Sequence, residues 1–351
     1  MSIKEFSKQK GIAWQEISNA KHKTVDNKKL ISSIILKDGV KPFDNDMDLV
    51  VFGSIARGEC TSKSDVDWTL LLDGQSDPND DDTGRYIKKK MIETKLADPS
   101  PSGLFGQITF SHDLIHYIGG EEDTNFNLSR RILLLLESER IDLGESADSS
   151  GTAYSRIILG ILERYLANDS AFHSDHGKRD NVPRFLLNDI VRFWRTMCVD
   201  FAYKQREQAG KNWALRNIKL RMSRKIIFIK GLLMCASSYK KPEISLTEIK
   251  TNFNRIVSLK PLDFIIDELI KYKISDKWII QLLDSYNNFL GMLNDDDLRD
   301  YIKKLPMKDV YTDAKFLKAR NNAHTFQEAL DKIFFYEDTP LKEFTLKYGL
   351  F

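Results

Sequence analysis

Two apolar runs in the first quarter of the chain dominate its hydrophobic pattern. The first passes through Val50, Val51 and Phe52 and stops at Gly53-Ser54. The second follows a polar segment and covers residues 66–72, where branched and aromatic residues prevail. Apolar runs of this length, bounded by glycine and polar residues, predict two buried strands joined by a turn.

Two aspartates, Asp65 and Asp67, stand where the second predicted strand begins. Side chains of a strand alternate between its two faces, so both carboxylates leave the sheet on one side and Val66 points the other way. Two carboxylates placed together at the start of a buried strand are costly unless a divalent cation lies between them. The spacing therefore predicts a metal site formed by Asp65 and Asp67.

The remainder of the first 145 residues alternates between helical and extended patterns. The pattern predicts helices at 30–36, 86–96 and 129–137, a third strand at 104–110, and a helix N-cap at 123–125. A Gly-, Ser- and Asp-rich segment at 142–151 predicts a domain boundary. We therefore expect one domain at 1–145 and a second at 146–351.

The second predicted domain shows helical spacing almost throughout. Its predicted helices cover 154–166, 183–204, 214–239, 262–272, 276–293 and 325–336. No strand-like alternation recurs after residue 152. The fold class predicted from the whole chain is α+β, with a small sheet first and an all-α domain after it.

Composition indicates the class of protein but points to no particular reaction. The 351 residues are 42% hydrophobic and 30% charged, with a net charge of +2, as in ordinary globular proteins. Three widely separated cysteines argue against a disulfide framework. The N-terminus has no apolar signal core, and the longest apolar run, 132–136, is too short to span a bilayer. We expect a cytoplasmic protein that does not enter membranes.

The Gly53-Ser54 turn suits a phosphate group. A glycine turn after a strand lets backbone amides and the Ser54 hydroxyl approach phosphate oxygens that a side chain would keep away. Arg57 has two alternatives, which are to reach a phosphate or to pair with Glu59. Mg²⁺ on Asp65 and Asp67 would bridge triphosphate oxygens.

These residues form one extended motif. It reads Gly53-Ser54-x-x-Arg57-Gly58-Glu59 and then Ser64-Asp65-x-Asp67. Over about residues 48–73 it resembles the nucleotidyltransferases of the DNA polymerase β superfamily, and it is most similar to PII-uridylyltransferase-like enzymes and cyclic-oligonucleotide synthases. The resemblance implies a polymerase β-like catalytic domain with a small mixed sheet, followed by a helical domain.

The resemblance also assigns roles to residues. Gly53 and Ser54, with Arg57 and Ser64, would bind the nucleotide, and Asp65 and Asp67 would hold Mg²⁺ or Mn²⁺. Such families usually have a third carboxylate on a neighbouring strand, but the third predicted strand has no acid. Asp113 is a candidate if that strand runs longer, and Asp123 if the following loop folds back.

The implied reaction transfers a nucleoside monophosphate from an NTP or dNTP, ATP among them, to a hydroxyl group and releases pyrophosphate. The acceptor is a protein, a tRNA or other RNA 3′ end, or a nucleotide. By analogy we expect a toxin–antitoxin or phage-defence setting, with room for a partner protein encoded nearby. Two alternatives stay open, which are template-independent synthesis of oligonucleotides as a defence signal and an inactive nucleotide- or nucleic-acid-binding module.

Basic residues concentrate at 204–230, and Glu207 is the one acidic residue in that span. Apolar residues at three-and-four spacing mark a buried helix face, and Arg221 and Arg224 fall on the other side. Such a stripe is either a solvated helix surface or a surface that holds a triphosphate or a nucleic-acid backbone. Arg130 and Arg131 are a second candidate for contact with phosphate.

Overall fold

The computed structural model describes residues 2–38, 44–75, 77, 79–96, 103–144, 151–167, 180–241 and 243–349. The chain folds into two compact units that interleave along the sequence. Unit 1 comprises Met1–Ala20, Ile190–Lys240 and Pro261–Phe351, and unit 2 comprises Lys21–Asp189 and Lys241–Lys260. Among the described residues, no helix is both long enough and apolar enough to cross a bilayer.

The predicted boundary between residues 145 and 146 lies outside the described residues, so a division into 1–145 and 146–351 stays a prediction. Helix α7 (Ala153–Ala167) lies beyond the predicted boundary. Its apolar face, with Ile157, Ile158 and Ile161 buried, packs on strands β1 and β2, although both strands come much earlier in the chain. Unit 2 therefore includes a helix from beyond that boundary.

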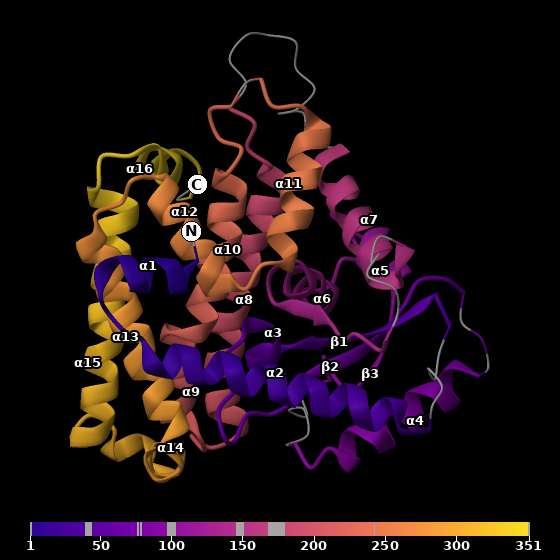
Figure 1. The fold of residues 1–351 in the computed structure, drawn as a ribbon, viewed down its shortest axis with the longest axis horizontal. Helices are drawn as coiled ribbons and strands as arrows, with labels where there is room; N and C mark the ends of the chain where they lie inside the picture. Colours follow the sequence, from indigo (N-terminus) through magenta and orange to yellow (C-terminus); the bar gives the residue numbers. More distant parts are fainter. Residues whose placement is uncertain are drawn as a thin grey trace. The chain divides into compact units, whose positions relative to one another are not determined.

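Unit 2 contains the small mixed sheet that the pattern predicted. Its strands are β1 (Met47–Phe52), β2 (Trp68–Leu72), β3 (Gln107–Phe110) and β4 (Ser138–Arg140), in the order β3-β2-β1-β4 (Figure 1). β2 and β3 run parallel, whereas β1 is antiparallel to both β2 and β4. The first three strands confirm the sequence prediction. β4 was not predicted, because three residues rich in charge directly after a helix give no strand pattern.

Helices cover both faces of this sheet. Unit 2 holds most of α2 (Gln15–Ile35), then α3 (Gly53–Arg57), α4 (Asp80–Glu93), α5 (Ser111–Ile115), α6 (Asn125–Leu136), α7 and α11 (Leu246–Ser258). Ile31 and Ile35 of α2 and Ile87 of α4 form one core with alternate residues of β1 and β2, and α2 runs across that face in Figure 1. α7 packs on the opposite face. β1 and β2 are therefore buried on both sides, as their uninterrupted apolar runs predicted.

Unit 1 is helical. It holds α1 (Ile3–Lys10), most of α8 (Arg184–Glu207), α9 (Trp213–Arg221), α10 (Ser223–Ala236), α12 (Pro261–Lys271), α13 (Asp276–Asn294), α14 (Asp296–Lys304), α15 (Ala314–Asp331) and α16 (Pro340–Phe344). No strand occurs in the part of unit 1 that the structure describes, as predicted. The single helix predicted at 214–239 is wrong, because the backbone breaks at Met222, with φ −113° and ψ −91°.

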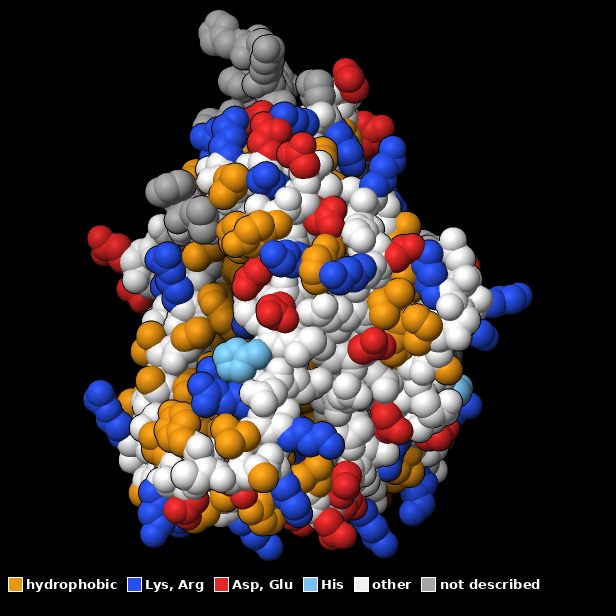
Figure 2. All heavy atoms as spheres, turned by 90° about the vertical axis from the view of Figure 1, so that its left-hand side faces the viewer, with side chains coloured by type: hydrophobic (Ala, Val, Ile, Leu, Met, Phe, Trp, Pro, Cys, Tyr) orange, Lys and Arg blue, Asp and Glu red, His pale blue; other side chains and the backbone are white. Residues whose placement is uncertain are grey.

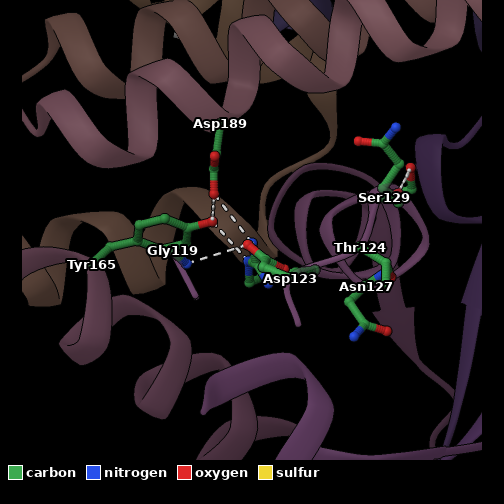
Figure 3. Close-up of polar contacts among 9 residues, drawn as sticks. Gly119, Asp123, Thr124, Asn127, Ser129, Tyr165 and Asp189 are labelled. Atoms are coloured by element: carbon green, nitrogen blue, oxygen red, sulfur yellow. Dashed lines mark hydrogen bonds and ion pairs between the residues drawn. The ribbon is translucent and has the colours of Figure 1, made fainter. Parts of the chain in front are cut away.

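A buried ionic network joins α6, α7 and the first turns of α8 within unit 2 (Figure 3). Arg131 is fully buried and donates two hydrogen bonds to Asp123, at 3.0 and 2.7 Å, and one of 3.1 Å to Asp189. The Tyr165 hydroxyl accepts a 2.7 Å bond from Arg131 and donates a 2.6 Å bond to Asp189. Arg131 was expected to contact phosphate, and Asp123 was a candidate for the third acid. Both expectations were wrong, because the two side chains are buried against each other.

We expect Arg131→Met to lower the free energy of unfolding by about 3–5 kcal/mol, because Asp123 and Asp189 would lose the cation that compensates them inside the protein. Urea denaturation followed by circular dichroism measures the change. Arg130→Met is the matched control, since that guanidinium lies 4.0 Å above the ring of Phe126 and its removal should cost about 1 kcal/mol at most. Equal losses in the two variants would contradict the structural role given to Arg131.

Candidate active site

Gly53 begins the turn after β1 and needs to be glycine for two reasons. Its φ of +67° lies in the left-handed region that other residues rarely adopt. A Cβ atom at this position would also lie 2.9 Å from Oδ2 of Asp67, closer than a side chain can approach. The sequence predicted glycine for access by phosphate, and the structure adds a contact with one of the two motif carboxylates.

Asp65 and Asp67 lie directly before β2 and not inside it. The Phe52 amide donates a 2.8 Å hydrogen bond to the Asp67 carbonyl, so the pairing with β1 continues beyond the strand. Val66 is buried, with 2% of its surface exposed, whereas both aspartates are half-buried. This alternation matches the expected geometry, in which the two carboxylates share the side opposite Val66.

A divalent cation fits this pair of carboxylates. Oxygen ligands of this kind are those that Mg²⁺ and Mn²⁺ prefer. No group of three His, Cys, Asp or Glu side chains that could hold a metal occurs in the described part of the chain. An ion here would therefore take its other ligands from phosphate and water oxygens, which is the usual arrangement for Mg²⁺ bound with a nucleotide.

Ser54 places a buried hydroxyl in the same turn. Its Oγ has no hydrogen-bond partner of standard geometry among the described residues, and the weakly bonding thiol of Cys60 lies near it. Burial raises the pKa of that thiol, so Cys60 is a poor candidate for a nucleophile. A buried hydroxyl without a firm partner is what a ligand oxygen would satisfy.

Arg57 is held by two glutamates. Its Nε donates to Glu59 at 2.7 Å, and its Nη1 pairs with Glu137, the residue that ends α6. Only 12% of the Arg57 side chain is exposed, and the two glutamates are more buried still. Of the two alternatives for Arg57, the structure contains the pairing with Glu59. Its placement favours holding the turn against α6 over direct contact with phosphate.

Ser64 stabilises the loop between α3 and β2. Its Oγ accepts a 2.9 Å hydrogen bond from the Thr61 amide and lies 3.2 Å from the Thr61 hydroxyl.

Lys260 is a further residue that contacts α3, and sequence reasoning missed it. It donates a 2.8 Å hydrogen bond to the Ala56 carbonyl from 204 residues away and pairs with Glu139 of β4. No local pattern predicts such a long-range contact.

The structure does not bring Asp113 to Asp65 and Asp67. β2 and β3 are parallel with Leu72 opposite Phe110, so Asp67 precedes one strand while Asp113 follows the other, at the opposite end. β3 itself has no carboxylate, and the Thr109 hydroxyl bonds to that of Thr69 at 2.8 Å. A third acid is therefore not evident among the described residues of this strand.

Arg221 and Arg224 belong to unit 1, whereas the motif belongs to unit 2. Arg221 donates a 3.0 Å hydrogen bond to Asn217 on its own helix. A role for these two arginines in binding the donor nucleotide stays a prediction.

Arg57→Gln should destabilise the protein by about 3–5 kcal/mol, because Glu59 and Glu137 would remain buried without their cation. Urea denaturation measures this loss, and titration of the folded variant with a labelled NTP should give nearly unchanged affinity. An unchanged free energy of unfolding, together with a large loss of affinity, would show that Arg57 contacts phosphate directly. Arg85→Gln, which removes an exposed arginine paired with Asp82, is the control.

Comparison with known families agrees with this geometry. Residues 34–99 match the family model described as "Nucleotidyltransferase domain", a range that includes β1, the Gly53-Ser54 turn, both aspartates and β2. No curated protein matches the chain. Members of the matched family act on nucleotides and typically use divalent metal ions. Residues 34–99 thus match a nucleotidyltransferase domain of the polymerase β-like superfamily, and this match supports a nucleotidyltransferase enzyme.

Proposed function

We propose that the protein transfers a nucleoside monophosphate from an NTP or dNTP, with ATP as one candidate, to a hydroxyl group of an acceptor. The acceptor oxygen forms a bond to the α-phosphorus, the bond between the α-phosphorus and its bridging oxygen breaks, and pyrophosphate leaves. One observation carries the proposal. The half-buried Asp65 and Asp67 flank the buried Val66 before β2, and Oδ2 of Asp67 lies close to a left-handed glycine of a phosphate-sized turn.

Different residues bind the triphosphate and the metal ion. The backbone of the Gly53-Ser54 turn and the buried Ser54 hydroxyl hold the triphosphate, and the contact with Gly53 fixes the carboxylate of Asp67 beside it. Asp65 and Asp67 would hold Mg²⁺, or Mn²⁺ in its place. When bound, the ion neutralises phosphate charge and lowers the pKa of a coordinated hydroxyl. Arg57 and Ser64 act indirectly, by keeping the turn in shape.

The acceptor is specified less closely than the nucleotide donor. No residue is assigned as its base, because β3 has no carboxylate and Asp113 lies at the other end of the strand pair. The resemblance supports a protein, a tRNA or an oligonucleotide as acceptor, in a toxin–antitoxin or phage-defence setting with a partner protein encoded nearby. Synthesis of oligonucleotides as a signal is the same chemistry with a nucleotide acceptor.

The lack of a third carboxylate on β3 favours a second candidate, a module that binds nucleotides without turnover. Incubation of the protein with Mg²⁺ and each α-labelled NTP or dNTP separates the two. We expect release of pyrophosphate, with the label on a protein, an RNA or an oligonucleotide. Binding of nucleotide without any release, in the presence of every acceptor class, would support the module.

Asp65→Asn and Asp67→Asn should each reduce pyrophosphate release at least about 100-fold, because an amide is a much weaker ligand for a divalent cation than a carboxylate. Asp81→Asn is the matched control, since Asp81 is exposed in the first turn of α4. Continuous pyrophosphate detection gives the rates. Equal rates in the control and the two site variants would refute the assignment.

Gly53→Ala should abolish most activity and also cost about 1–2 kcal/mol of stability through its left-handed backbone. Gly11→Ala is a close control, because Gly11 has the same φ of +67° but nothing within 4 Å of its added Cβ. Gly53→Ala should lose at least as much stability as Gly11→Ala in thermal denaturation, and only Gly53→Ala should lose activity. Full activity in Gly53→Ala would show that the contact with Asp67 is not needed.

A further inference from the structure

An exposed tyrosine stands among cationic side chains in unit 1. Tyr311, which precedes α15, is 60% exposed, and the guanidinium of Arg320 lies 5.6 Å from its ring centre. Arg221, the last residue of α9, lies close enough to Tyr311 and Arg320 for their charges to act on its own. Lys225 of α10 lies beside Arg221. We call Arg221, Lys225, Arg320 and Tyr311 the basic surface.

These cations lack acidic partners. Within the described part of the chain, none of Arg221, Lys225 and Arg320 forms an ion pair with a carboxylate. Arg221 donates to the Asn217 side chain at 3.0 Å, and Lys225 donates to that of Gln327. Asp331 and Cys198 act on Lys225 electrostatically without pairing with it.

The like charges act on one another. The pKa of Arg221 is lowered by burial and then by the positive charge of Arg320. The pKa of Lys225 is lowered by burial and then by Arg221. Cations held close together without counter-charges attract anions.

This arrangement differs from an ordinary protein surface. Figure 2 shows Lys and Arg side chains mixed with Asp and Glu over much of the face that it draws. Mixed signs of this kind serve solubility and need no ligand. The net charge of +2 therefore hides a local excess of positive charge at the basic surface.

We infer that the basic surface binds single-stranded nucleic acid. Arg221 and Arg320 provide separate contacts for successive phosphates, Lys225 adds positive charge beside Arg221, and the exposed ring of Tyr311 offers a platform on which an unpaired base can stack. A duplex keeps its bases stacked on one another, so it could use the charges but not the tyrosine. This binding goes beyond nucleotide transfer and does not depend on the activity of Asp65 and Asp67.

Fluorescence anisotropy with labelled 12-nucleotide single strands, one of RNA and one of DNA, tests the inference. We expect binding that weakens steeply with salt. The double variant R221Q/R320Q should bind about tenfold more weakly at 50 mM salt, and the slope of log K against log salt should fall by about 1.4, as expected for two lost phosphate contacts. Tyr311→Leu should weaken binding about tenfold and Tyr311→Phe hardly at all, because phenylalanine keeps the stacking ring.

The control K88Q/K89Q removes two exposed lysines from α4 in unit 2 and should leave the affinity within about twofold of the wild type. Asp67→Asn should bind the single strands normally, so failure of the binding inference and failure of the transfer reaction can be told apart. The inference is overturned if single strands do not bind at 50 mM salt. It is also overturned if the control loses as much affinity as R221Q/R320Q, if Tyr311→Leu binds like the wild type, or if a duplex binds as tightly.

Discussion

The close packing of Asp67 against Gly53 is the constraint around which the active-site turn is arranged. Oδ2 lies 2.9 Å from the place that a Cβ of residue 53 would occupy, so a larger residue there would displace this carboxylate. The contact brings the end of β1 next to the start of β2, where we propose that the turn binds phosphate and the aspartates hold the metal ion.

Buried cations hold the elements around this turn. Arg57 joins the end of α3 to Glu137, directly after α6, and Lys260 joins the same short helix to β4 through Glu139. Earlier in α6, Arg131 contacts α7 through Tyr165 and α8 through Asp189, and it pairs with Asp123 just before α6. These ion pairs are costly to break and give little net stability when intact, so their main effect is to fix which elements lie together.

The sequence was most informative where the pattern was local. β1 and β2 are uninterrupted apolar runs, and the Gly53-Ser54 turn with Asp65 and Asp67 follows from residue types and spacing. The contacts of the charged residues could not be predicted in the same way. Arg57 and Arg131 are residues of the type that binds phosphate, yet each also pairs with a carboxylate far along the chain, Glu137 for Arg57 and Asp189 for Arg131. β4 was missed for a related reason, since three residues form a strand only because β1 offers an open edge.

We propose that the triphosphate and its cation bind one short segment of unit 2, and a crystal structure with Mn²⁺ and a non-hydrolysable NTP tests this most directly. We predict anomalous density about 2.2 Å from carboxylate oxygens of both Asp65 and Asp67, with triphosphate oxygens against the Gly53-Ser54 turn. Mn²⁺ bound elsewhere, or a triphosphate that does not touch this turn, would contradict it.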